Sequence, residues 1–274
     1  MGNTNHTDRK GQQSIGVFDS GIGGLTVANA INRVLPNEHL IYFGDTAHLP
    51  YGDKSADAIR YYALRISKFL LEQDCKMIVI ACNSASAAAS DMLMEFFEGK
   101  VLFANVIDPL VKYTVSKGYT NVGVIATKAT IGSNVYQRKL KAQNQRIFVN
   151  QLATPLLAPM IEEGFFHNNI SQEVIKNYLS NESMQNLDSL LLACTHYPLI
   201  RDEIEAYYNG RVDILDSCDV LAKQVKNILS AESMLATYRD KTHKYYVSDF
   251  TQSFEDTAKL FNGTEIELEV RNIW

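Results

Sequence analysis

The sequence predicts an α/β protein with two similar doubly wound parallel-sheet domains related by pseudo-symmetry. The first observation is an unbroken apolar run at residues 77–81, typical of a strand covered on both faces. It is followed by Cys82-Asn83-Ser84 and small residues that favour a helix. The second observation is that residues 190–196, Leu-Leu-Leu-Ala-Cys-Thr-His, repeat this pattern. Because ligands bind at the carboxyl ends of parallel strands, we expect one thiol from each half in a shared cleft, the active site.

Strands and helices alternate along the first half of the chain, as a doubly wound sheet requires. Short apolar runs predict strands at residues 15–19, 39–44, 77–81 and 101–106. Helices are expected between or after them, at residues 25–34, 55–72 and 84–97. The helix at 55–72 has the clearest pattern, because its apolar side chains recur at helical spacing on one face.

The cycle restarts at Asp108-Pro109, which opens a new helix. Residues 121–127, Asn-Val-Gly-Val-Ile-Ala-Thr, echo residues 14–20, Ser-Ile-Gly-Val-Phe-Asp-Ser. Further strands are predicted at residues 147–152, 187–193, 212–215, 245–247 and 265–270. Further helices are predicted at residues 129–143, 155–163, 171–179, 197–208, 220–229 and 254–261. We therefore expect a disordered tail at 1–13, a first domain at 14–107 plus 215–274, and a second domain at 108–214.

The composition is that of an ordinary soluble protein, with 46% hydrophobic and 21% charged residues in 274. A net charge of −5 without a basic stripe argues against a nucleic-acid partner. No apolar run approaches the ~18–20 residues that span a bilayer, so no membrane partner is expected. The first 13 residues are polar and lack the apolar core of a secretion signal, which favours a cytoplasmic location.

The four cysteines are widely spaced and none forms a Cys-x-x-Cys pair. A disulfide framework is therefore not expected, and a zinc site at Cys82, Cys194 and His196 would lack metal-type spacing. A lone cysteine beside a buried strand is usually structural. Cys82 and Cys194 lie at equivalent strand ends, and this repetition indicates a functional role. Cys75 and Cys218 have no symmetric counterparts, so we expect them to take no part in the chemistry.

Two glycine-containing segments allow more than one interpretation. Asp19-Ser20-Gly21-Ile22-Gly23-Gly24 lies between a strand and a helix, where backbone amides bind anions. It is neither a dinucleotide nor a phosphate-loop motif, so a tight turn is the simpler reading. Pro50-Tyr51-Gly52 is also a turn, although near a cleft its amides and the Tyr51 hydroxyl would hold a carboxylate.

These patterns leave a nucleotide-binding regulatory module open, in which the glycine loop is used and the cysteines are inert. A cysteine hydrolase is also open, because His196 follows Cys194 by two positions and a Cys–His pair makes a nucleophile. Such an enzyme would release a leaving group.

Four blocks together resemble a known family. They are Val-Phe-Asp19-Ser20-Gly21-Ile-Gly23-Gly24-Leu, Asp45 through Pro50-Tyr51-Gly52, Ala-Cys82-Asn83-Ser84-Ala, and Ala-Cys194-Thr195-His196-Tyr-Pro-Leu. They resemble, in order, the signature blocks of the glutamate racemases of the aspartate/glutamate racemase superfamily, over about residues 14–230. Ser84 stands where the family commonly has Thr, and Ala193 where it commonly has Gly.

The resemblance implies cofactor-independent racemisation of L- and D-glutamate by Cys82 and Cys194, acting on opposite faces of the substrate Cα, with no metal. It implies that Asp19 and His196 flank and assist the thiols, and that Glu162 is an auxiliary acid near His196. The substrate contacts it implies are Asp19, Ser20, Tyr51, Gly52, Asn83, Ser84, Thr195 and His196, with Thr127 and Thr130 as further additions.

The resemblance also implies a role and partners. D-glutamate would supply peptidoglycan synthesis, and with it cell-wall biogenesis and cell shape, in a bacterial cytoplasm. Glutamate is the expected small-molecule partner, and we expect a homodimer. An aspartate racemase, or another two-cysteine amino-acid racemase, is the nearest alternative function.

Overall fold

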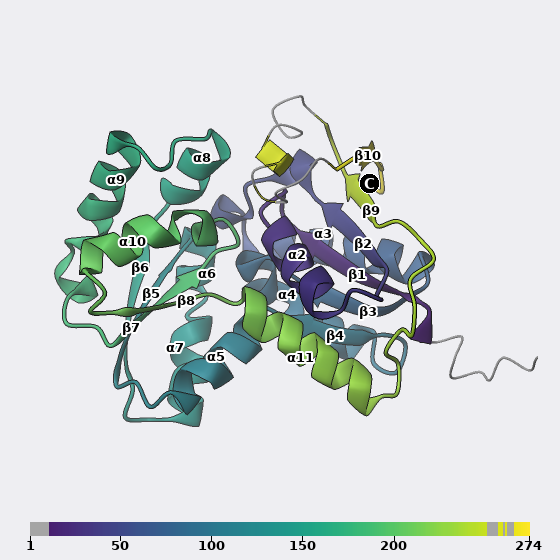
Figure 1. Cartoon of the computed structure of the whole chain (residues 1–274), viewed down its shortest axis with the longest axis horizontal. Helices are drawn as coiled ribbons and strands as arrows, with labels where there is room; N and C mark the ends of the chain where they lie inside the picture. The colour runs from purple at the N-terminus through teal and green to yellow at the C-terminus, as the bar shows by residue number, and fades with distance from the viewer. Residues whose placement is uncertain (1–10, 251–256, 260, 262–265) are drawn as a thin grey trace, which may run out of the picture.

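The computed structural model describes residues 11–250, 257–259, 261 and 266–274, and contains two parallel sheets side by side (Figure 1). The first sheet has the strand order β10-β9-β2-β1-β3-β4. Its strands are β1 (Ser14–Asp19), β2 (Leu40–Gly44), β3 (Cys75–Ile80), β4 (Leu102–Asn105), β9 (Lys244–Val247) and β10 (Leu268–Val270). We call this sheet and its helices the first lobe.

The second sheet has the order β6-β5-β7-β8 and, with its helices, forms the second lobe. Its strands are β5 (Asn121–Ala126), β6 (Phe148–Ala153), β7 (Ser189–Ala193) and β8 (Asp213–Leu215). This order repeats the order β2-β1-β3-β4 of the first sheet. β3 and β7 therefore occupy equivalent places, and a cysteine lies just beyond the end of each. The predicted fold class is confirmed.

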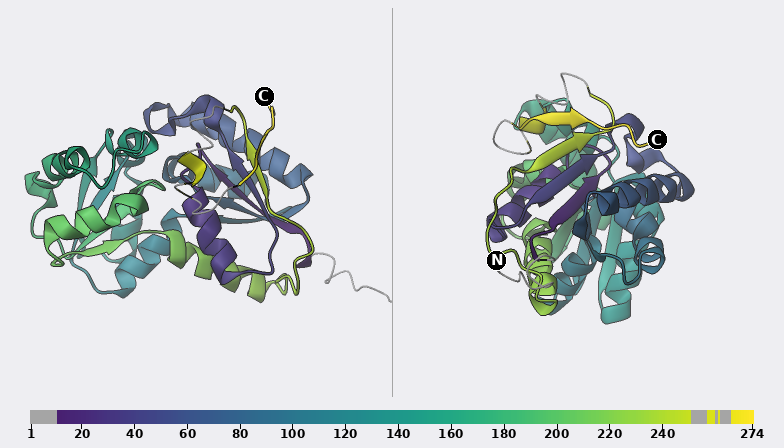
Figure 2. Two further views of the ribbon diagram at one scale, coloured as in Figure 1. Left: turned by 45° about the horizontal axis from the view of Figure 1, so that its top comes forward. Right: turned by 90° about the vertical axis from the view of Figure 1, so that its right-hand side faces the viewer.

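Helices flank both sheets (Figure 2). Those of the first lobe are α2 (Leu25–Val34), α3 (Ala56–Glu72), α4 (Asn83–Phe96) and α11 (Cys218–Ala231). Those that follow in the middle of the chain are α5 (Ile107–Ser116), α6 (Lys128–Gly132), α7 (Val135–Gln143), α8 (Leu157–Glu162), α9 (Asn169–Leu179) and α10 (Arg201–Tyr208). α2 packs against α11, and α11 against α5, which in turn packs on α7. These contacts join the two lobes.

Alternation along the central strands explains their unbroken apolar sequences. In β3, Met77 and Val79 enter the core shared with α2, α11 and the second lobe, whereas Ile78 and Ile80 face α3 and α4. A strand covered on both faces needs apolar side chains at every position. The predicted domain division remains a proposal. It is supported by β9 and β10, which come from the end of the chain and extend the first sheet.

Three local predictions differ from the structure. The helix predicted at 129–143 is divided into α6 and α7, because Asn134 adopts a left-handed conformation with φ 59° that ends the first helix. The helix predicted at 197–208 begins as a 3₁₀ turn, Tyr197–Ile200, before α10. Residues 11–13, expected in a disordered tail, are held in place, since Lys76 Nζ donates to the Gly11 carbonyl at 2.6 Å.

Half of the helix predicted at 254–261 lies outside the described residues, and residues 257–259 and 261, which are described, are helical. Residue 265, the start of the strand predicted at 265–270, also lies outside the described residues. None of the helices in the described part of the chain is long and apolar enough to cross a membrane.

Candidate active site

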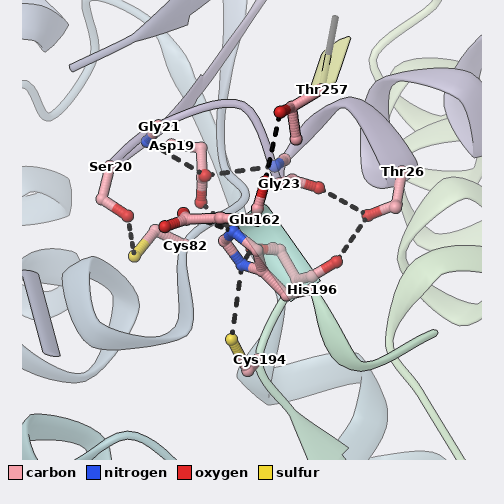
Figure 3. Close-up of polar contacts among 12 residues, drawn as sticks. Asp19, Ser20, Gly21, Gly23, Thr26, Cys82, Glu162, Cys194, His196 and Thr257 are labelled. Atoms are coloured by element: carbon pink, nitrogen blue, oxygen red, sulfur yellow. Dashed lines mark hydrogen bonds and ion pairs between the residues drawn. The ribbon is translucent and has the colours of Figure 1, made fainter. Parts of the chain in front are cut away.

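A cavity of about 240 Å³ lies between the lobes, beyond the ends of β3 and β7. Cys82 and Cys194 both line it and are 5% and 8% exposed. Of the predicted substrate contacts, the structure brings to this cavity Ser20, Tyr51, Gly52, Asn83, Ser84, Thr195 and His196. Thr127 and Glu162 line it too. The polar contacts around the two thiols are drawn in Figure 3.

Cys82 caps the amino terminus of α4, so its sulfur accepts a hydrogen bond from the Ala85 amide at 3.4 Å. Its thiol also lies 3.6 Å from Ser20 Oγ, to which it donates. The dipole of a helix would by itself stabilise a thiolate at this amino terminus. The opposite effect dominates, because burial, together with the nearby charge of Asp19, raises the pKa of Cys82 to about 12. At neutral pH this residue is a thiol.

Cys194 follows β7 and is followed by a 3₁₀ turn. Whereas Cys82 contacts the amino terminus of a helix, the neighbouring polar group of Cys194 is a histidine. His196 Nδ1 lies 3.6 Å from Cys194 Sγ, and His196 Nε2 lies 2.8 Å from Glu162 Oε1. Burial lowers the pKa of His196, but its bonds to Cys194 and Glu162 outweigh burial and raise that pKa well above its usual value. The two thiols therefore have different surroundings: Cys82 caps a helix terminus near the buried Asp19, whereas Cys194 lies beside the imidazole of His196.

Asp19, like Thr130, is a predicted site residue that does not line the cavity. It is fully buried at the end of β1, where its Oδ2 accepts from the amides of Gly21 at 3.2 Å and Gly24 at 3.1 Å. Its Oδ1 accepts from Thr195 Oγ1 at 3.5 Å. Burial raises the pKa of Asp19 despite these donors and the nearby His196. The side chain holds the turn after β1, and its contact with substrate stays a prediction.

The hydrogen bonds of Asp19 decide between the two interpretations of the glycine loop at residues 19–24. The amides of Gly21 and Gly24, which a phosphate would need, are already bonded to Asp19. A Cβ at Gly24 would lie 2.5 Å from the Asp19 Cβ, so the turn requires glycine for close approach. The tight-turn interpretation therefore explains the loop better than nucleotide binding does.

Hydroxyl groups from both lobes meet on one wall of the cavity. Ser84 Oγ lies 2.9 Å from Thr127 Oγ1 and 3.2 Å from Thr130 Oγ1. Beside them, Asn83 Oδ1 accepts from Tyr136 Oη at 2.7 Å, while Asn83 Nδ2 is buried with no hydrogen-bond partner among the residues that the structure describes. A buried donor without a partner costs about 1–3 kcal/mol, and a ligand oxygen would remove that cost.

Tyr51 differs from its prediction in one respect. Its hydroxyl, which we expected to hold a carboxylate, donates to Asp45 Oδ2 at 2.6 Å, and the side chain is 1% exposed. Asp45 Oδ1 also accepts from Ser248 Oγ at 2.7 Å. Tyr51 therefore forms part of the cavity wall, and the residues that follow Asp45 are held in shape by that carboxylate.

Five apolar residues of the cavity wall were not predicted as site residues, namely Leu49, Pro50, Ala193, Ala158 and Pro159. The last two belong to α8, in the second lobe, and carry no functional group that a motif could reveal. Among the described lining residues none is Lys or Arg. An anionic ligand would therefore be held by neutral amides and hydroxyls, with His196 as the cationic group.

Comparison with known proteins is consistent with this geometry. A family model described as Asp/Glu/Hydantoin racemase matches residues 15–225. The glutamate racemase of Chlorobaculum parvum is 40% identical over 256 residues, which cover 92% of this chain and 93% of that protein. The crystal structure of glutamate racemase from Francisella tularensis in complex with D-glutamate is 38% identical, with a TM-score of 0.90. It covers 96% of this chain and 98% of that one.

A third relative is the glutamate racemase of Thermus thermophilus, crystallised with beta-chloro-D-alanine, at 36% identity and a TM-score of 0.86. Its match covers 95% of this chain and 97% of that one. Fold and site thus define a two-lobed α/β enzyme with one thiol from each lobe. The chain belongs to the Asp/Glu/hydantoin racemase family, whose members are isomerases, and within that family it groups with the glutamate racemases.

Proposed function

We propose that this protein interconverts L- and D-glutamate by a two-base reaction of Cys82 and Cys194, without an added cofactor. The observation that carries the proposal is the placement of the two thiols. They lie at equivalent strand ends of a duplicated fold and both line one cavity. A racemase must bind both enantiomers of its substrate, and a duplicated site provides a base on each face of the substrate Cα.

The reaction balances with two protons and two thiols. One cysteine, as the thiolate, takes the Cα proton and becomes a thiol, leaving a carbanion. The other cysteine, as the thiol, donates its proton to the opposite face of Cα and becomes a thiolate. The product carries a proton from the second thiol, and the enzyme ends with its two protonation states exchanged.

The two environments favour one starting state. With its pKa raised to about 12 by burial, Cys82 begins as the proton donor. We assign the starting base to Cys194, because the imidazole of His196 lies 3.6 Å from its sulfur and can stabilise a thiolate there. Family resemblance assigns Cys194 to L-glutamate, so the resting enzyme is prepared for the L-to-D direction.

The barrier requires help from the surrounding dipoles. If Cα–H is roughly 20 pKa units less acidic than a thiol, proton transfer is uphill by about 27 kcal/mol. Fixed donors near the substrate reduce that cost, since they need no reorganisation during the reaction. The free Asn83 Nδ2 and the hydroxyls of Ser84 and Thr127 are the donors that we assign to substrate carboxylates.

Glutamate is favoured over aspartate by the relatives at 36–40% identity, which are glutamate racemases. The cysteine hydrolase alternative draws on the 3.6 Å contact of Cys194 with His196. It leaves Cys82 unused on the opposite wall, and it predicts hydrolysis in place of inversion.

The test is racemisation of L-glutamate in deuterated water, followed by circular dichroism and by proton NMR at Cα after the first turnovers. Two bases require the inverted product to carry deuterium, because the donor is not the base that abstracted. Cys82→Ser and Cys194→Ser should each abolish net racemisation, since a hydroxyl is a far weaker base. Inverted product that retained its own proton, or substantial activity in either variant, would refute the two-base proposal.

A dialysis experiment tests the absence of a cofactor. We expect full activity after exhaustive dialysis, and activity lost and then restored by pyridoxal phosphate, metal or nucleotide would contradict the proposal. The remaining parts of the proposal are a supply of D-glutamate to peptidoglycan, and so to cell shape, in a bacterial cytoplasm, and a homodimeric enzyme.

A further inference from the structure

Trp274, the last residue of the sequence, packs against the segment that forms one wall of the cavity. Its indole meets the His48 ring edge-on, with centroids 4.4 Å apart, and the Tyr62 ring in the same way at 5.4 Å. His48 also stacks on the Tyr62 ring, with the two ring centroids 4.2 Å apart. The three rings thus form one aromatic cluster in which His48 touches both neighbours. Arg65 Nη2 donates to the Ile273 carbonyl and holds the chain next to Trp274.

His48 transmits this packing to the cavity through Asp45. His48 Nδ1 lies 2.9 Å from Asp45 Oδ1, and Asp45 Oδ2 accepts a hydrogen bond from the Tyr51 hydroxyl at 2.6 Å. We call residues 45–52 the substrate loop, because its last four residues, from Leu49 to Gly52, line the cavity. Gly52 completes the wall next to Thr127, where an added Cβ would lie 2.8 Å from the Thr127 Cβ.

The end of β9 holds the same loop from another side. Ser248 Oγ accepts from the Ala47 amide at 2.9 Å and donates to Asp45 Oδ1 at 2.7 Å. Thr46 Oγ1 donates to the Asp249 carbonyl at 2.5 Å and accepts from the Asp249 amide at 2.9 Å. The residues that follow β9 and those that follow β10 therefore both contact the substrate loop, by hydrogen bonds at Ser248 and Asp249 and by aromatic packing at Trp274.

We propose that Trp274 is a positioning residue for substrate binding, which holds the substrate loop in its cavity-lining shape through His48 and Asp45. The inference rests on the proposed function for its substrate, glutamate. Trp274 does not line the cavity, and its indole Nε1 is buried with no hydrogen-bond partner in the described part of the chain. Its contribution is thus ring packing, so a phenylalanine retains most of it while an alanine removes it.

Steady-state kinetics with both enantiomers give the first test. Trp274→Ala should raise KM for L- and D-glutamate about threefold to tenfold, the value of one or two aromatic contacts, with kcat within about twofold. Trp274→Phe should restore most of the KM. Phe148→Ala is the matched control, because it removes an aromatic side chain that is 70% exposed on β6 and away from the cavity. An unchanged KM in Trp274→Ala, or an equal rise in Phe148→Ala, overturns the proposal.

Hydrogen exchange gives a test that needs no activity. Peptides covering residues 45–52 should exchange faster in Trp274→Ala than in the wild type, and at the wild-type rate in Trp274→Phe and Phe148→Ala. Unchanged exchange in Trp274→Ala overturns the proposal even if the enzyme proves to have another substrate. An inactive wild type with the expected exchange pattern would refute the glutamate assignment alone. If Trp274→Ala does not fold, His48→Ala breaks the same connection and should give the same KM and exchange changes.

The chain contains a single tryptophan, so Trp274 also reports on the loop directly. Titration of the wild type with D-glutamate should change the tryptophan emission, with a midpoint near the KM. The same titration of His48→Ala should show a smaller change, because the ring that connects the indole to Asp45 is gone. A wild-type emission that stays constant while glutamate saturates the enzyme would also overturn the proposal.

Discussion

Gly23 of the first lobe lies against His196 of the second, at a separation that leaves no room for a side chain. A Cβ at Gly23 would be 2.6 Å from His196 Nδ1 and 2.8 Å from Thr195 Oγ1. Nearby, Thr26 Oγ1 donates to the Thr195 carbonyl at 3.2 Å. The turn after β1 therefore sets the position of the imidazole that contacts Cys194.

Gly23→Ala should displace His196 and lower kcat/KM by about 100-fold, the effect expected when a catalytic group moves by about 1 Å. The assay is racemisation of L-glutamate, with thermal unfolding measured in parallel. Gly21→Ala is the control, because its Cβ would meet only the Leu49 side chain at 3.7 Å, an ordinary contact. Similar activity in the two variants would show that His196 tolerates displacement or plays no part in the reaction.

The two thiols should differ in their reactivity toward iodoacetamide. The racemisation equilibrium constant is one, so kcat/KM is equal for the two enantiomers and cannot reveal the asymmetry. Cys194, beside a protonated His196, should be alkylated faster than Cys82 at pH 7. With a pKa raised to about 12, Cys82 gains thiolate as pH rises, so its rate should increase about tenfold per unit from pH 7 to 9.

Mass spectrometry of labelled peptides measures both rates, and D-glutamate should protect both residues. Faster labelling of Cys82 than of Cys194 at pH 7 would reverse the assignment of donor and base. Slow labelling of both would favour the alternative in which the cysteines are inert.

Ser84→Ala should weaken substrate or transition-state binding by about 1–3 kcal/mol, because the hydroxyls of Thr127 and Thr130 lose one of their hydrogen-bond partners at the cavity wall. Ser84→Thr keeps the hydroxyl and should be tolerated. Kinetic constants for the two variants, compared with the wild type, decide the matter. Unchanged kinetics in Ser84→Ala would limit this hydroxyl to joining α4 and α6.

The stability of the first lobe should depend on His243. Burial, with the charges of Arg239 and His39, lowers the pKa of His243 to about 4 in the folded protein, from 6.5 in the unfolded chain. The unfolded chain thus binds the proton more readily, so this stability is present above pH 6.5 and is lost as pH falls toward 4. After discounting for partial exposure, we expect a loss of about 1 kcal/mol between pH 7 and pH 4.5.

Urea unfolding at these two pH values measures the loss, and His243→Gln removes its source. The glutamine variant should therefore lose less stability than the wild type over the same interval. Equal losses in the two proteins would exclude His243 as the titrating group.

Much of the fold follows from local sequence. The apolar run before Cys82 is covered on both faces because every one of its side chains is apolar, and its repeat before Cys194 predicts the duplicated sheet. The break at Asn134 was not predicted, because the left-handed conformation depends on the backbone around it. Local patterns therefore predict which elements exist better than where they are interrupted.

By itself, the sequence determined which strand ends carry the thiols, because strand, cysteine and following residues are neighbours in the chain. Only the tertiary structure decided what each polar group bonds to, because its partners are distant in sequence. Asp19 is used by its own turn and by Thr195, and the Tyr51 hydroxyl is used by Asp45. Burial, which raises the pKa of Cys82 against the helix dipole, is likewise a property of the assembled core, since it depends on residues from many segments of the chain.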